Sequence, residues 1–441
     1  MVRYKMQDII FRPLFWFLVL ITIGAFSIHP IYNRTTFPSY YYVGADTNGY
    51  TQYPYNIFNG EFGSSRTPLY PLFLKLVYWG FNCDSILNEV EHTPQGTPVS
   101  DHIVQGEETC FYVVCFQLCL YILTLIPFYF ACGKFLHHPV IHFTSVLLIG
   151  MLFLRYQWWI LTEPLAITGS LLFLSLITFY HFHPTHGLSI GVGILTFFLI
   201  MLRPVFIYLL PLLSAFWLLR FFICPQDRQY SISGILTILL VISGLFGYAK
   251  MNLKNHQCYT ISTTALNNHF IIIFQTDYYL RSSDAEILEY ISNSPLNCKA
   301  SKYILFNDLI ERFGYDRIKC FVHTTIKDNL FDFAVFNIKR MWWEKDIYFF
   351  TPLYFLIAFE FLIMLCLGIY FKQFPWFHGI LFFNIFTYLF VMYFGGIDCY
   401  ERLIIPVMPI AILQLARHVD LFATINSGNT ENTIKYLQNT L

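Results

Sequence analysis

The sequence predicts an all-α integral membrane protein, a polytopic helix bundle of about ten spans with outer-face loops and a small, mostly helical periplasmic cap. Its 441 residues are 56% hydrophobic and only 12% charged, whereas soluble proteins carry roughly 25% charged residues. Long apolar segments recur along the chain, and positive residues gather in the short connections on one side of them. These observations exclude an ordinary soluble domain.

About ten segments are long and apolar enough to cross a bilayer, which requires roughly 20 residues in a helix. They lie at 13–30, 110–131, 138–155, 159–180, 187–203, 204–223, 231–250, 347–370, 376–396 and 402–419. The first is too long for a cleaved signal peptide and many other segments follow it, so we expect it to remain as an anchor.

The short connections predict the orientation, because Lys and Arg are enriched in cytoplasmic loops. Positive residues fall on one side of the bundle, at Arg3, Lys5, Arg12, Lys134, Arg220, Arg228, Lys372 and Arg417. We therefore expect a multi-pass protein of the inner (plasma) membrane with both termini in the cytoplasm. Two long polar regions then face the periplasm or an equivalent outside space.

These two polar regions divide the chain. In the first, residues 70–81 are too few to span and carry Lys75, Tyr78 and Trp79, which is typical of a helix lying in the membrane interface. The second has helical patterns at 285–292, 301–313 and 324–341. The predicted divisions are 1–30 (N-terminus and first span), 31–108 (outer loop), 109–250 (transmembrane core), 251–345 (periplasmic cap), 346–420 (C-terminal spans) and 421–441 (cytoplasmic tail).

Several common kinds of site have no support in the sequence. No C-x-x-C or H-E-x-x-H motif indicates zinc, and no P-loop or Rossmann glycine pattern indicates ATP or a nicotinamide cofactor. The formal net charge of zero gives no reason to expect a nucleic-acid partner. Cys83 and Cys110 bracket the polar part of the first loop, where a disulfide and two separate thiols both remain open.

A group of charges stands at the predicted outer ends of the helices, at Arg66, Arg155, Glu163, Arg203, Asp398, Glu401 and Arg402. A charge at membrane depth costs about 2.5–3.5 kcal/mol on insertion scales, so it is usually paired, hydrated or functional. A single arginine at a helix end can simply extend to the lipid headgroups. Four arginines at one face favour a phosphate-bearing lipid, because a guanidinium matches phosphate oxygens.

Asp46 is the lone acid of the stretch GADTNGY, residues 44–50, in the first outer loop. An aspartate near a low-dielectric bundle is a candidate general base. The same stretch is also ordinary turn chemistry, in which Asp46 would only hydrogen-bond its own backbone. The residues alone leave both readings open.

The order of these features resembles the GT-C class of polytopic glycosyltransferases, in particular the branch with protein O-mannosyltransferases and bacterial lipid A aminoarabinose transferases. Asp46 matches the aspartate that this branch places in its first outer loop. The other matching segments are RTPLYPLFLKLVY at 66–78, LTEPLAITGSLLFL at 161–174, LRPVFIYLLPLL at 202–213 and YERLIIPVMPIAIL at 400–413. Each motif is weak alone, but their shared order covers about 30–415.

The resemblance implies transfer of a hexose or pentose from a polyprenyl-phosphate-linked donor to a lipid, glycan or protein acceptor, with the active site on the outer face. Asp46 would be the catalytic base. Substrate and phosphate would contact Arg66, Tyr70, Glu163, Arg203 and Arg402, with Glu163 pairing an arginine or holding the acceptor. No metal ligand is assigned. Metal-using members often have adjacent acidic residues where this chain has Ala45 and Thr47, so a divalent cation stays open.

Two other classes of function are compatible with a polytopic protein. A lipid or sugar transporter, including a flippase, commonly shows inverted repeats and helices broken near the midplane, and neither is evident here. A scaffold that recruits other envelope proteins has no sequence feature of its own. Turnover of a polyprenyl-phosphate sugar distinguishes an enzyme from both.

Overall fold

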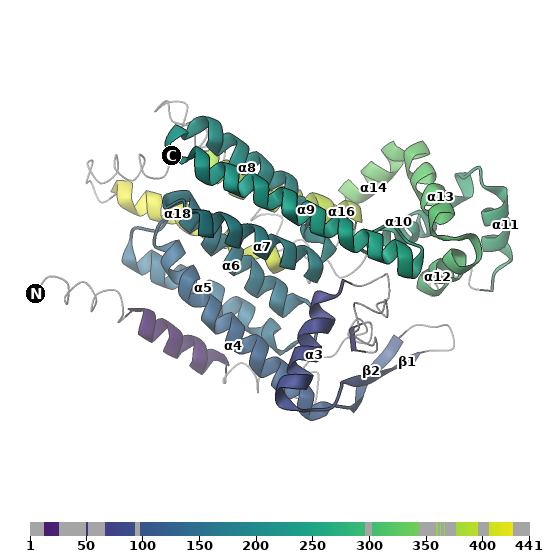
Figure 1. Cartoon of the computed structure of the whole chain (residues 1–441), viewed down its shortest axis with the longest axis horizontal. Coiled ribbons are helices and arrows are strands. Elements are labelled where there is room, and N and C mark those ends of the chain that lie inside the picture. The colour runs from purple at the N-terminus through teal and green to yellow at the C-terminus, as the bar shows by residue number, and fades with distance from the viewer. Residues whose placement is uncertain are drawn as a thin grey trace, which may run out of the picture.

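The computed structural model describes residues 13–25, 50–51, 67–92, 98–295, 302–343, 359, 362, 366, 376–395 and 405–426. Helices dominate these residues and form a bundle with a smaller helical unit at one end (Figure 1). Five helices are long and apolar enough to cross a membrane, three of them together with the 3₁₀ turn that adjoins them. They are α4 (Glu107–Cys132), α5 (Pro139–Leu154), α6 (Glu163–Phe182), α8 (Leu209–Ile223) and α9 (Arg228–His256).

Shorter helices occupy other predicted segments. They are the helix Pro13–Ala25, α7 (His186–Leu202), α16 (Trp376–Gly395) and α18 (Met408–Asn426), which the 3₁₀ turn η8 (Ile405–Val407) precedes. The predicted span 347–370 lies outside the described residues apart from three isolated positions. The total of about ten spans therefore stays a prediction.

The first outer loop contains one element that was predicted and one that was not. The apolar run at 70–81 is the helix α3 (Leu69–Phe81), as expected. A hairpin follows it, in which β1 (Leu87–His92) pairs antiparallel with β2 (Pro98–Gln105). The hairpin supplies backbone partners for a polar segment that has no helical periodicity, and its end leads directly into α4.

The smaller unit is built from α10 (Thr264–Gln275), the 3₁₀ turn η5 (Tyr278–Arg281), α11 (Ala285–Asn293), α12 (Lys302–Phe313), α13 (Tyr315–Asp328) and α14 (Leu330–Trp343). It has a hydrophobic cluster of its own, with Phe270, Leu309 and Ile318 fully or almost fully buried. We call this unit the cap. Its location in the periplasm stays a prediction.

One predicted cap helix is wrong. The pattern at 324–341 is two helices, because α13 ends at Asp328 and Asn329 leaves the helical conformation. The Asn329 amide donates to the carbonyl of Thr325 at 2.8 Å, and its oxygen accepts from Arg281 at 2.8 Å. These side-chain bonds offer the backbone an alternative to a continuous helix.

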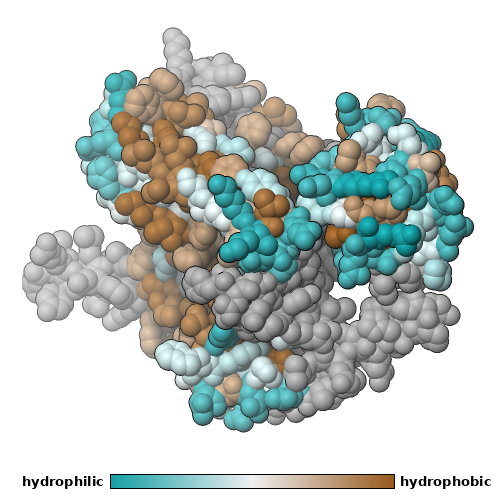
Figure 2. Space-filling view, turned by 45° about the vertical axis from the view of Figure 1, so that its right-hand side comes forward, coloured by the Kyte–Doolittle hydropathy of each residue, from teal (hydrophilic) through white to brown (hydrophobic). Residues whose placement is uncertain are grey.

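Small residues allow close packing within the bundle. Gly234 of α9 faces the fully buried ring of Trp217 in α8, and Gly193 of α7 faces Thr237 of α9. Large apolar side chains such as Leu236 and Leu240 instead point away from the bundle. Figure 2 shows hydrophobic residues gathered on the bundle and hydrophilic ones over the cap. Close contact at small residues and an apolar exterior are typical of helices in lipid.

The helix α18 is hydrogen-bonded to the turn between α4 and α5. Asp420 of α18 is fully buried, and its carboxylate accepts the backbone N–H groups of His137 at 2.9 Å and His138 at 2.8 Å. His138 immediately precedes α5. The carboxylate therefore caps the positive end of α5 and holds α18 against it.

We predict that Gly234→Ala lowers the free energy of unfolding by about 1–3 kcal/mol, because the added methyl group collides with the Trp217 ring and the core must shift. Gly247 in the same helix has open space at the corresponding atom. Gly247→Ala should leave stability unchanged or raise it by up to about 1 kcal/mol. Unfolding of both variants in detergent measures the difference, and equal stabilities would contradict the packing described.

Candidate functional site

Three of the six residues predicted for the site fall within the described part of the chain. Glu163 opens α6, Arg203 follows α7, and Tyr70 lies in the first turn of α3. Asp46, Arg66 and Arg402 lie outside the described residues.

The local sequence around Arg203 produces a step between two helices. The backbone at Arg203 is extended, with φ −144° and ψ 116°, and Pro204 begins the 3₁₀ turn η3 (Pro204–Tyr208). Proline disfavours a helical conformation in the residue before it, so α7 ends at Leu202. The step leaves Arg203 at the end of the bundle where α6 begins.

Glu163 occupies a related position at a helix start. It is the first residue of α6 and Pro164 follows, a placement that fits proline's missing N–H group. Its side chain is only 2% exposed, and the Thr162 hydroxyl donates to Oε2 at 3.5 Å. A carboxylate here is favoured by the positive end of the helix.

Arg203 and Glu163 form a buried ion pair. Arg203 Nη1 lies 3.5 Å from Glu163 Oε1, and the arginine side chain is 11% exposed. A buried charge needs a partner of opposite sign, and each residue supplies one for the other. The separation is long for a hydrogen bond, however, and Nη1 is buried without an acceptor. The pair therefore balances charge but leaves an N–H donor unused.

Tyr70 connects α3 to the bundle. Its hydroxyl donates to Gln117 Oε1 at 3.2 Å, and Gln117 Nε2 donates to the carbonyls of Gln157 at 3.2 Å and Trp159 at 3.0 Å. Burial raises the pKa of Tyr70 well above its ordinary value, and the negative charge of Glu163 adds to this. The Tyr70 hydroxyl therefore keeps its proton and can donate a hydrogen bond near the negative charge of Glu163.

A second link joins α3 to the end of α7. The hydroxyl of Thr67 donates to the carbonyl of Leu202 at 3.0 Å, and both residues are buried. Thr67 follows Arg66 in the sequence, and Leu202 precedes Arg203. This hydrogen bond therefore connects the motif at 66–78 with the motif at 202–213, although the two are far apart in the chain.

The helix α16 covers the other side of the ion pair. Tyr388 is fully buried and interacts electrostatically with both Arg203 and Glu163. Its ring packs 5.6 Å from that of Tyr208, whose hydroxyl donates to Asn384 at 2.8 Å. Sequence analysis missed Tyr388, Asn384, Gln117 and Gln157. The amides could have been noticed as polar residues in or beside apolar segments.

Arg155 makes its contacts with Tyr156 and not with the ion pair of Arg203 and Glu163. It is exposed, its guanidinium donates to the hydroxyl of the neighbouring Tyr156, and it lies 4.6 Å from the centre of that ring. Arg155 therefore fits the alternative of an arginine that extends to the lipid surface.

The described residues contain no cluster of three metal-ligating side chains. The divalent cation left open by the sequence would involve Asp46, which lies outside the described residues. The disulfide considered between Cys83 and Cys110 is not present in the structure.

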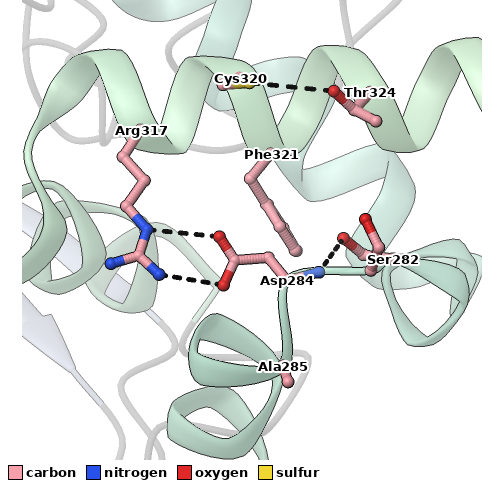
Figure 3. A pocket seen from close by; sticks show the side chains of 8 residues that line it. Ser282, Asp284, Ala285, Arg317, Cys320, Phe321 and Thr324 are labelled. Carbon is pink, nitrogen blue, oxygen red and sulfur yellow. Dashed lines mark hydrogen bonds and ion pairs between the residues drawn. The ribbon is translucent and has the colours of Figure 1, made fainter.

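A separate cavity of about 420 Å³ lies in the cap between the start of α11 and α13 (Figure 3). Arg317 and Asp284 form a two-bonded ion pair at its edge, with distances of 3.1 and 3.3 Å. Burial would raise the pKa of Asp284, but these bonds hold it below its ordinary value. Of the predicted site residues that the structure describes, Tyr70, Glu163 and Arg203, none lines this cavity.

No protein-family model and no curated protein matches the sequence. The fold matches solved structures of the oligosaccharyltransferase of the archaeon Archaeoglobus fulgidus. The form with zinc and sulfate has a TM-score of 0.50 at 12% identity over 96% of this chain, and the apo form has 0.50 at 11% over 96%. A third structure, with an inhibitory peptide and a dolichol-phosphate, has a TM-score of 0.48 at 12% identity over 95%.

The chain spans about half of each solved chain, covering 50%, 52% and 51% of their lengths in the same order. At this identity the likeness concerns the fold.

Proposed function

We propose that this protein is a glycosyltransferase that moves a sugar from a polyprenyl-phosphate-linked donor to a lipid, glycan or protein acceptor at the outer face of the inner membrane. The buried Arg203, held by Glu163 with an N–H donor still available, is the observation that carries the proposal. A fixed cation with a free donor at the end of a membrane bundle suits a lipid phosphate. The fold shared with an oligosaccharyltransferase supports the same reaction class.

In the proposed reaction, Asp46 accepts the proton of the acceptor hydroxyl as its oxygen attacks the anomeric carbon of the sugar. The bond from that carbon to the phosphate oxygen breaks, and the lipid phosphate leaves with the bonding electrons. Arg66, Arg203 and Arg402 stabilise its developing charge. The bond from Thr67 to Leu202 supports a shared role for Arg66 and Arg203, because it joins their sequence neighbours.

Tyr70 and Glu163 have supporting roles in this proposal. Glu163 holds the guanidinium of Arg203 and balances its charge. Tyr70 fixes α3 against Gln117 and keeps the outer loop close to the pair. A lipid or sugar transporter is the second candidate, favoured only by the membrane-spanning character of the helices. Supplying labelled polyprenyl-phosphate sugar separates the two, because only the enzyme releases free polyprenyl phosphate.

Replacing Arg203 with Ala should reduce sugar transfer by about 10²–10³-fold, the range measured when one stabilising donor is removed from an enzyme. Arg203→Lys should recover only part of the activity, since Lys lacks the planar fork. Arg155→Ala is the matched control, because Arg155 is exposed and outside the group. Transfer by Arg203→Ala at the parental rate would remove Arg203 from the mechanism.

The ion pair itself predicts a pattern in stability. Glu163→Gln alone leaves Arg203 as a buried unbalanced charge and should cost about 3–5 kcal/mol of unfolding free energy. The double variant Glu163→Gln with Arg203→Met should recover most of this stability but no activity. Thermal unfolding and donor turnover of these two variants and of Arg203→Met alone give the test. Additive losses in stability would show that the two side chains are not coupled.

Asp46→Asn keeps the size of the side chain but removes its capacity to accept a proton. We expect correct membrane insertion with transfer reduced at least about a hundredfold, as for the loss of a general base. Glu61 is the control, because it lies in the same loop and matches no motif of the family. If Asp46→Asn transferred sugar as fast as Glu61→Gln, Asp46 would be a turn residue and not the base.

A further inference from the structure

Gln157 is a buried amide without a hydrogen-bond partner. It lies in the 3₁₀ turn η2 (Arg155–Trp158), which connects α5 to the start of α6. The residue is fully buried, and neither Nε2 nor Oε1 of its side chain is hydrogen-bonded. Leaving a buried amide unpaired is costly, and native proteins rarely do so without a reason.

The neighbouring Gln117 shows that the fold does not need the side chain of Gln157. The Gln117 amide is fully used, since it accepts from Tyr70 and donates to the carbonyls of Gln157 and Trp159. These bonds fix the backbone of η2 through its carbonyl groups. Gln117 therefore has a structural role, whereas Gln157 contributes only its backbone to the same network.

The unpaired amide lies at the same end of the bundle as the ion pair. The turn η2 packs against α4 and α6, and α6 begins with Glu163, six positions after Gln157. Arg203 Nη1, beside Glu163, is also buried without an acceptor. Two buried polar groups therefore have unused hydrogen-bonding capacity near the start of α6. One is the charged guanidinium, which is ion-paired but makes no hydrogen bond through Nη1, and the other is the neutral amide.

The two groups suit different parts of one ligand. A phosphate offers only acceptors, which match Arg203 but would leave Gln157 Oε1 unpaired. An ammonium group offers only donors and would leave Nε2 unpaired. Hydroxyl groups both donate and accept, so neighbouring hydroxyls on a sugar ring can satisfy both ends of the amide.

We propose that Gln157 binds hydroxyl groups of the sugar carried by the donor, while Arg203 binds the phosphate to which that sugar is attached. This inference rests on the proposed glycosyltransferase function and adds which part of the donor each residue recognises. A buried group that must hydrogen-bond a substrate hydroxyl discriminates strongly against a substrate that lacks it. Gln157 is then a residue that determines which sugar is accepted.

The first part of the test uses the full-length protein in detergent without lipid. Gln157→Leu replaces the amide with an apolar side chain of similar size and should raise the midpoint of thermal unfolding, because an unpaired group is removed. Gln117→Leu is the matched control and should lower the midpoint, because three hydrogen bonds are lost. A lowered midpoint for Gln157→Leu would show that the amide is already bonded, for example to a structural water, and would overturn the inference.

The second part adds five lipids one at a time: undecaprenyl phosphate, and the same lipid carrying mannose, glucose, galactose or arabinose. In the parent protein, one of these sugars should raise the midpoint beyond the effect of the bare lipid. In Gln157→Leu that additional increase should disappear and the affinity for the sugar-bearing lipid should fall roughly 10- to 100-fold, as expected for the loss of two hydrogen bonds. The response to the bare lipid should be unchanged.

The outcomes separate this inference from the proposed function. Retention of the sugar-dependent increase in Gln157→Leu would overturn the role of Gln157 and leave the function intact, as would a parent protein that gains nothing from any of the four sugars. A parent protein that responds to none of the lipids would overturn the proposed function, and the role of Gln157 with it.

Discussion

The ion pair between Arg203 and Glu163 is the contact around which the candidate site is organised. An arginine in apolar surroundings is stable only when a carboxylate balances its charge, and here the carboxylate comes from the start of another helix. Proline beside each residue fixes where α6 begins and where α7 ends. The start of α3 and one face of α16 are then positioned by contacts to the same region.

The opposite end of the bundle provides a comparison. Arg220 is more deeply buried, with 4% of its side chain exposed against 11% for Arg203. One of its terminal nitrogens lies 2.6 Å from Asp227 and the other donates to the carbonyl of His181 at 3.1 Å, so that only Nε lacks a partner. This arginine is held by short contacts within the protein. Arg203 Nη1 reaches Glu163 only at 3.5 Å and makes no hydrogen bond. The difference in contacts explains why we assign a ligand to one arginine and a structural role to the other.

Apolar length and periodicity were sufficient to predict most helices of the bundle and α3, because both signals are local. The break at Asn329 was missed because it depends on Arg281, which is 48 positions away. The hairpin was missed because strand pairing is not visible in either strand alone. Gln157 is noticeable in the sequence as a polar residue beside an apolar segment, but that its amide has no hydrogen-bond partner is visible only in the structure.

Helix length explains why motifs so distant in sequence meet. The helices α6 and α7 have 20 and 17 residues, which correspond to about 30 and 26 Å at 1.5 Å per residue. A short turn connects them, so the chain crosses the bundle and returns to the end from which it started. Glu163 and Arg203 therefore meet although 39 residues separate them in the sequence. Because the two helices are similar in length and run in opposite directions, charges placed at alternate helix ends converge on one face. The order of weak motifs therefore carries structural information that no single motif has.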